Sequence, residues 1–177
     1  PIPNVIPFGS ITMFYGESFA GKTRELPDVA LRLRDGRLFC GHPTTQQEVG
    51  IITTDHYWRL DQGKVFRAAG WPDIPHVSLK DKDVPVDWHR LKTDDSKYRE
   101  ELLRVCCRKL ALTPGHGTVI LDIGEIFITK ETNDYNAVSC GINILQGVTY
   151  DQFGLTVIAT GHCSKPSGKE RTEIHHH

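Results

Sequence analysis

The amino-acid sequence predicts an α/β fold with a mainly parallel sheet and flanking helices. Short runs of β-branched and apolar residues alternate with longer segments of helical periodicity, which is typical of parallel sheets. Polar residues directly follow several of these runs, as they do where strands end at one edge of a sheet. The 177 residues suffice for one domain with a sizeable core. We interpret residues 1–174 as that domain and the histidines at 175–177 as a tag remnant.

The first strand and the first helix are predicted close together. Residues 11–15, Ile-Thr-Met-Phe-Tyr, form a short apolar run with high β-propensity. After Thr23, apolar residues recur as they do on one face of a helix, at Leu26, Val29, Ala30 and Leu33. Asp35-Gly36 is expected to end this helix. Pro27 is expected in its first turn or so, where a missing N–H is tolerated.

Further strands and helices are predicted from the same two periodicities. The expected strands are residues 37–40, 49–54, 76–79, 118–122 and 155–160. The expected helices span about 58–69, 96–112 and 133–150, and Ser96 is expected to cap the second of them. Residues 80–92 are charged and are predicted to form a loop, and a polar loop at 161–169 follows the last strand.

Residues 16–23 carry the most specific pattern in the chain, G-x-x-x-x-G-K-T. This spacing is typical of a phosphate-binding loop between a strand and a helix, in which backbone N–H groups surround a phosphate and glycines allow its close approach. We expect Lys22 to reach the β- and γ-phosphates and the Thr23 hydroxyl to bind Mg²⁺. The predicted nucleotide contacts are Gly16, Glu17, Ser18, Phe19, Ala20, Gly21, Lys22, Thr23 and Arg24.

Besides the Thr23 hydroxyl, the metal needs an acidic side chain, and Asp122 fits this role. It ends the apolar run Val119-Ile120-Leu121, which is the pattern of a buried strand followed by a carboxylate associated with Mg²⁺. Many motors of the AAA+ and helicase kinds place a water-activating Glu directly after this Asp, but here that residue is Ile123. Glu125 would fall on a different face if the strand continued.

The water-positioning carboxylate is therefore expected elsewhere, and Asp55 is the best candidate. It follows the strand predicted at 49–54, which as a parallel neighbour of the first strand would point its end at the γ-phosphate. The alternative is that Asp55 only caps the next helix. His162 follows the last strand and either contacts the γ-phosphate or is a structural histidine. Lys165 and Lys169 either touch phosphates of nucleic acid or a neighbouring subunit, or are solvated.

The composition is that of a soluble globular chain. The apolar content is 38%, the charged content is 24% and the net charge is −1, which gives no electrostatic argument for nucleic acid or an anionic membrane. There is no apolar run of about 18 residues and no signal-peptide pattern, so we expect no membrane span and a cytoplasmic location. The five cysteines lack a C-x-x-C and indicate reduced thiols. Cys106-Cys107 is interpreted as a buried helical pair, with a redox pair or metal ligands as the alternative.

The order of these motifs resembles the RecA-like ATPase core, and within it the RepA-like hexameric helicases and related phage and plasmid replication ATPases. The similarity covers most of residues 9–169, with a less similar middle at 70–95. The similar stretches are 9–16 leading into Gly21-Lys22-Thr23, then 36–43, 49–56, 119–122, 131–134 and 157–165. The phosphate loop is highly specific, whereas the other stretches are specific mainly through their order and spacing.

The resemblance implies a P-loop NTPase of the RecA-like kind, a three-layer sandwich that binds ATP and Mg²⁺. Lys22 and Thr23 match the nucleotide-binding lysine and hydroxyl, Asp122 matches the metal-associated acid, and His162 matches the polar sensor at a strand end. The family usually has Glu where this chain has Asp55, which is shorter by one methylene.

The resemblance also implies partners. Family members hydrolyse ATP in DNA replication or recombination as homo-oligomeric rings or filaments, so single-stranded DNA is an expected partner. The neighbouring subunit supplies an Arg or Lys finger, which usually lies beyond the last strand seen here. That part of the fold is therefore expected to be missing from this chain, or its role to be taken by Lys165, Lys169 or Arg171.

Two other functions stay open. A P-loop kinase would transfer phosphate to a small molecule and would need an arginine-rich lid, for which Arg99, Arg104 and Arg108 are the clustered candidates. A solvated helix face explains these arginines more simply. A nucleotide-gated assembly module would use ATP to order an oligomer interface with little hydrolysis, and the absent finger and the short Asp55 motivate this alternative.

Overall fold

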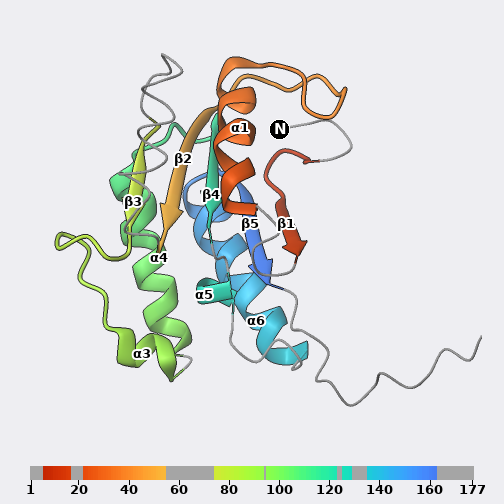
Figure 1. Cartoon of the computed structure of the whole chain (residues 1–177). Helices are drawn as coiled ribbons and strands as arrows, with labels where there is room; N and C mark the ends of the chain where they lie inside the picture. The colour runs from red at the N-terminus through yellow and green to blue at the C-terminus, as the bar shows by residue number, and fades with distance from the viewer. Residues whose placement is uncertain are drawn as a thin grey trace, which may run out of the picture.

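A five-stranded, all-parallel sheet forms the centre of the computed structural model, which describes residues 6–16, 22–54, 74–93, 95–122, 125–128 and 135–162. The spatial order of the strands is β1-β5-β4-β2-β3 (Figure 1). The strands are β1 (Ile11–Gly16), β2 (Glu48–Thr53), β3 (His76–Ser78), β4 (Gly117–Leu121) and β5 (Thr156–His162). The predicted α/β class with a parallel sheet is therefore confirmed.

Helices cover both faces of the sheet and give three layers (Figure 1). The helices are α1 (Lys22–Asp35), α3 (Trp88–Lys92), α4 (Ser96–Leu110), α5 (Glu125–Ile128) and α6 (Tyr135–Gln146), which continues into the π-helical turn η2 (Gly147–Gln152). One buried cluster joins α1 to the sheet, and a second joins α4, α5 and the α6–η2 segment to the other face.

The buried strand β4 shows how the two clusters divide the sheet. All of its residues are buried, and successive side chains point to opposite faces, as the pleat requires. Val119 and Leu121 belong to the cluster under α4, while Ile120 belongs to the cluster under α1. A continuous apolar run was therefore the correct sign of a strand that is buried on both faces.

The cysteine pair of α4 lies in the core, as predicted. Cys106 and Cys107 are buried as free thiols. Burial raises the pKa of each thiol to about 12, because the apolar surroundings disfavour the thiolate. Both thiols are therefore poor nucleophiles at neutral pH.

Several local expectations were wrong. The expected strand at 37–40 is instead a tight turn, in which Phe39 and His42 exchange both backbone hydrogen bonds and Cys40 and Gly41 have φ of 48° and 80°. The expected loop at 80–92 contains α3.

The predicted details of two helices were also wrong. The N-cap of α4 is Asp95 and not Ser96, since the Asp95 carboxylate accepts a hydrogen bond from the backbone N–H of Tyr98. Pro27 lies inside α1, beyond its first turn. The helix expected at 58–69 lies outside the described residues.

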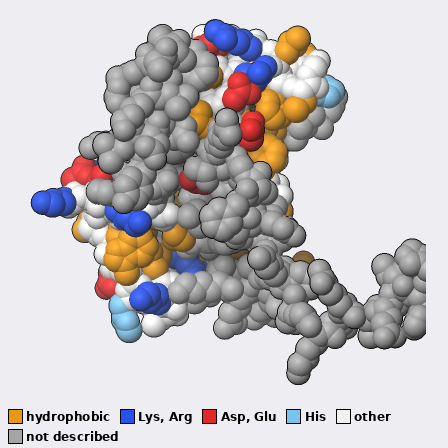
Figure 2. Space-filling model, viewed as in Figure 1, with side chains coloured by type: hydrophobic (Ala, Val, Ile, Leu, Met, Phe, Trp, Pro, Cys, Tyr) orange, Lys and Arg blue, Asp and Glu red, His pale blue; other side chains and the backbone are white. Residues whose placement is uncertain are grey.

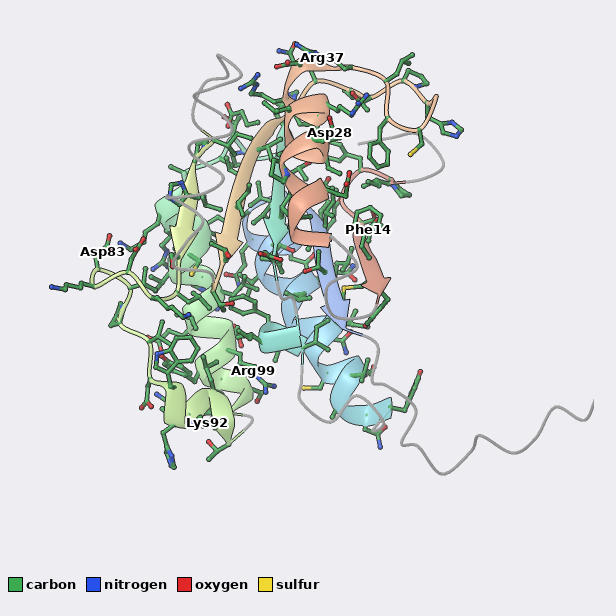
Figure 3. The ribbon with its side chains drawn as sticks, in the orientation of Figure 1. Phe14, Asp28, Arg37, Asp83, Lys92 and Arg99 are labelled. Atoms are coloured by element: carbon green, nitrogen blue, oxygen red, sulfur yellow. The ribbon has the colours of Figure 1, made fainter. Side chains whose placement is uncertain are left out.

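The helix expected at 133–150 is observed as α6 followed by η2, and its tight packing against α5 depends on Gly141. A Cβ built on Gly141 would lie 2.2 Å from the Ile128 carbonyl oxygen, so the two backbones are close together. The same carbonyl accepts a hydrogen bond of 3.1 Å from Nη1 of the buried Arg99 on α4, which Figure 3 labels beside α5. These contacts fix α5, the helix that follows Asp122.

We predict that Gly141→Ala destabilises the fold by roughly 1–3 kcal/mol, because the added methyl group overlaps backbone atoms that cannot rotate away. Gly147→Ala is the matched control, since a Cβ there meets nothing within 4 Å. Urea denaturation of both variants measures the difference. Equal stability of the two variants would contradict the close approach at Gly141.

Glu48 ties the start of β2 to the turn before β4. Its carboxylate accepts hydrogen bonds of 2.7 and 2.9 Å from the backbone N–H and the hydroxyl of Thr113. These hydrogen bonds lower the pKa of the Glu48 carboxyl below its ordinary value of 4.5, and the bond from the backbone N–H has the larger effect.

Because the folded-state pKa is lowered, the stabilising effect of Glu48 is complete above the unfolded-state pKa and is lost as the pH falls through the folded-state value. We predict that the free energy of unfolding falls more steeply below about pH 4.5 in the wild type than in Glu48→Gln. Urea denaturation at a series of acidic pH values measures this. Parallel curves for the two proteins would show that the carboxylate has no such role.

Candidate functional site

The carboxyl edge of the sheet holds a buried carboxylate, that of Asp122. It comes directly after β4 and is only 5% exposed. Its backbone N–H donates a 2.9 Å hydrogen bond to the Ile52 carbonyl, which continues the pairing of β4 with β2 by one residue. A buried carboxylate requires hydrogen-bond donors, because burial without them is costly.

Two threonines from the neighbouring strands donate to this carboxylate. The Thr53 hydroxyl lies 3.4 Å from Oδ2 and the Thr160 hydroxyl lies 3.3 Å from Oδ1. The strand register explains the arrangement, since Ile52 pairs with Leu121 and Leu121 pairs with Ala159. The next residue of each strand therefore lies at the same level. The three side chains are on the α1 face, because the preceding residues Ile52, Leu121 and Ala159 face the opposite cluster.

The strand and the helix that flank the predicted phosphate loop also meet at this edge. β1 ends at Gly16 and α1 begins at Lys22, so the strand–loop–helix order holds (Figure 1). Gly16 is in register with His162 at the end of β5. The structure thus brings Gly16, the start of α1, the end of β5 and Asp122 to one edge of the sheet.

The sheet order corrects one expectation about Asp55. The strand before it, β2, pairs with β3 and β4 and is not a neighbour of β1. The neighbour of β1 is β5, which carries His162 at its end. Asp55 therefore follows the strand beside Asp122, and the argument that its strand adjoins the phosphate loop does not hold.

Several predicted site residues cannot be placed further. Residues 17–21, Asp55, Ile123, Lys165 and Lys169 lie outside the described residues. Lys22, Thr23 and Arg24 form the first turn of α1, and His162 ends β5, but the positions of their side chains are not described. β4 ends at Leu121 and Glu125 begins α5, so Glu125 does not lie on a continuation of the strand.

Sequence reasoning missed Thr53 and Thr160. Thr53 ends β2 and Thr160 lies two residues before the end of β5, and both are on the α1 face at the level of Asp122. They can be identified by placing the three strands side by side and following each one, because alternate side chains of a strand face the same side of the sheet. This requires the strand order, which the sequence does not supply.

The donor set at this edge fits Mg²⁺. Asp122, Thr53 and Thr160 present carboxylate and hydroxyl oxygens, which are the hard ligands that Mg²⁺ prefers. Within the described ranges, no group of three or more His, Cys, Asp or Glu side chains is arranged to hold a metal ion alone.

Comparison with models of known protein families gives no match for this chain, and comparison with curated proteins gives none. Among the described helices, none has the length and apolar character needed to cross a membrane.

We predict that Thr160→Val destabilises the protein by about 1 kcal/mol or more, because a nearly isosteric change removes a donor from a buried carboxylate. Thr118→Val is the matched control on β4. Thr118 is also buried, but its hydroxyl has no hydrogen-bond partner in the described part of the chain, so this variant should be neutral or more stable. Thermal and urea unfolding measure both variants, and an equal loss in the two would argue against the Thr160–Asp122 bond.

Proposed function

We propose that this chain is a RecA-like ATPase core that binds ATP with Mg²⁺ and couples ATP hydrolysis to work on DNA, in replication or recombination. The observation that carries the proposal is the buried Asp122 carboxylate at the carboxyl edge of a parallel sheet, on the face covered by α1. In open parallel sheets, ligands bind at this edge. The G-x-x-x-x-G-K-T segment joins β1 to α1 at the same edge.

The phosphate-binding part of the proposal rests on the context of the motif. The pattern is meaningful when it follows a strand and opens a helix, and here it lies between β1 and the 14-residue α1. A helix of this length presents a positive dipole end and free backbone N–H groups at its start. Lys22 at that position would pair with the β- and γ-phosphates, and Thr23 would contribute a hydroxyl to Mg²⁺.

The metal-binding part rests on Asp122. Asp122 and the Thr23 hydroxyl would hold Mg²⁺, which would supply positive charge to offset the charge that develops on the transferred phosphate. Thr53 and Thr160 each donate to a different oxygen of the Asp122 carboxylate, and the two hydrogen bonds hold its orientation. In this orientation the carboxylate would accept a hydrogen bond from a water molecule bound to Mg²⁺.

The hydrolytic part rests on two residues at the ends of β5 and β2, the strands on either side of β4. His162 ends the strand beside β1, in register with Gly16, and is proposed to sense the γ-phosphate. Asp55 is proposed to position the attacking water. It follows β2 and so comes from the strand beside Asp122, rather than from a neighbour of β1.

Two of the three arginines considered for a kinase lid, Arg99 and Arg104, have other partners. Arg99 is buried and donates to the Ile128 carbonyl. Arg104 pairs with Glu100 and donates to Gln152. Both belong to α4, on the opposite face of the sheet from α1. No observation therefore favours the kinase over the ATPase.

The assembly module differs from the ATPase only in turnover. It would bind Mg²⁺ and ATP at the same edge, and oligomerise with negligible hydrolysis. Single-stranded DNA, a homo-oligomeric ring or filament and a finger from the neighbour remain part of the proposal and rest on the resemblance.

We predict that Lys22→Ala weakens ATP binding at least about tenfold and abolishes turnover, because a charge-assisted contact to phosphate is lost. The control is Lys97→Ala, which removes an exposed lysine from the first turn of α4 and should leave both unchanged. Equilibrium titration and phosphate release, with and without single-stranded DNA, measure the effects. Unchanged ATP affinity in Lys22→Ala would refute the site.

Asp55→Asn separates the ATPase from the assembly module. We predict that it retains ATP affinity and loses most of its turnover, because an amide is a poor acceptor for the proton of the attacking water. The control is Asp151→Asn at an exposed position of η2. Equal turnover in Asp55→Asn and wild type would reject Asp55 as the water-positioning group. ATP-dependent oligomerisation of the wild type with negligible turnover would favour the module.

A further inference from the structure

A cleft of about 460 Å³ opens between α1 and the edge strand β1. Its lining comes from β1, α1, the turn at Phe39-Cys40 and one residue of β5, Thr160. Figure 3 labels Phe14 on β1 and Asp28 on α1, which line it from two sides. Figure 2 shows apolar side chains next to acidic ones in this part of the surface, at the upper right of the view.

The cleft adjoins both ends of the predicted phosphate loop. Tyr15 lines it directly before Gly16, and Glu25 lines it in the first turn of α1. Thr160 lines it too, and the hydroxyl of Thr160 is the one that donates to Asp122. One residue therefore borders both the cleft and the candidate metal site, so a ligand with phosphates at the loop could extend into the cleft.

The lining suits a flat aromatic ring. Phe14 and Phe39 supply aromatic surface, and Leu26 and Val29 supply aliphatic surface. Volumes of about 300–1,000 Å³ are usual for small-molecule sites, which are mostly apolar with a few polar groups. Aromatic side chains of this kind stack on nucleobases of any sequence.

The polar groups of the cleft add hydrogen-bond acceptors. Nε of Arg32 donates to Asp28 at 2.6 Å, and Nη1 of Arg32 donates to the Leu38 carbonyl at 2.6 Å, which holds the Phe39 turn against α1. The carboxylate of Asp28 is thus engaged by Arg32, whereas that of Glu25 is exposed and has no partner among the described residues. A carboxylate beside a nucleotide accepts hydrogen bonds from ribose hydroxyls, as acidic residues do in dinucleotide sites.

We infer that this cleft binds the nucleoside part of a nucleoside triphosphate, with the base against Phe14 and Phe39 and the ribose hydroxyls near Glu25. The inference rests on the proposed function, since it assumes phosphates at residues 16–23. It adds the place of the base and the ribose and the residues that would contact them.

The first experiment separates the cleft from the phosphate loop by using inorganic triphosphate and ATP, each with Mg²⁺, as probes in equilibrium titration. We expect wild type to bind ATP roughly tenfold or more tightly than inorganic triphosphate, because base stacking adds affinity. Phe39→Ala should remove most of this advantage and leave the affinity for inorganic triphosphate unchanged. Tyr135→Ala, which removes an exposed aromatic ring on α6, should change neither.

Three results of this titration would overturn the inference. Equal affinity for ATP and inorganic triphosphate would show that the cleft contributes nothing while the phosphate loop stands. Phe39→Ala that keeps the full advantage of ATP over inorganic triphosphate would show that the base does not lie against this ring. Failure of both ATP and inorganic triphosphate to bind would refute the proposed function and this inference together.

A second experiment needs no change in the cleft. Cys40 lines it and is exposed, so its rate of modification by a maleimide reports occupancy. In a Cys140→Ser/Cys163→Ser background, a non-hydrolysable ATP analogue with Mg²⁺ should slow the modification of Cys40 severalfold, and inorganic triphosphate should not. Buried Cys106 and Cys107, with raised thiol pKa, should not interfere.

Cys140 on α6 is the control for this labelling. It is exposed on the opposite face of the sheet, so in a Cys40→Ser/Cys163→Ser background its modification should not respond to either ligand. Unchanged modification of Cys40 with bound ATP analogue would contradict the inference. Protection of Cys40 that depends on protein concentration and not on nucleotide would show that a second copy of the chain fills the cleft instead.

Discussion

The contact on which the candidate site depends is the one that holds the Asp122 carboxylate between Thr53 and Thr160. Three parallel strands must be in register for these side chains to meet at one level. The observed pairs Ile52–Leu121 and Leu121–Ala159 give this register. The geometry of the candidate site is thus set by the same strand pairing that builds the sheet.

The two faces of the sheet have different roles in this account. The α4–α6 face holds the larger core, with Arg99 and Gly141 fixing α5 directly after Asp122. The α1 face carries the polar ends of the strands and the cleft beside β1. The cleft lies on the face that carries the strand ends, and the sequence motif at residues 16–23 is the basis for proposing a triphosphate as its ligand.

Much of the fold could be predicted from the sequence, because buried strands such as β4 are continuous apolar runs and α4 has a clear apolar stripe. The errors have local physical causes. Residues 37–40 have the composition of a strand, but Cys40 and Gly41 adopt positive φ and turn the chain. The role of Asp55 was inferred from an assumed strand order, and the observed order places β5 and β4 between β1 and β2. Thr53 and Thr160 could not be found, since hydroxyls that support an acid across strands leave no spacing pattern in one sequence.

The central claim is that Asp122 and the phosphate loop form one site for Mg²⁺ and a nucleoside triphosphate. The most direct test is the coupling between the two ligands, measured as the ATP affinity of wild type and Asp122→Asn by calorimetry with Mg²⁺ and with excess chelator. The account predicts that Mg²⁺ strengthens ATP binding to the wild type and has much less effect on Asp122→Asn, while the affinity without metal is similar in the two proteins. An equal effect of Mg²⁺ on both proteins would contradict it.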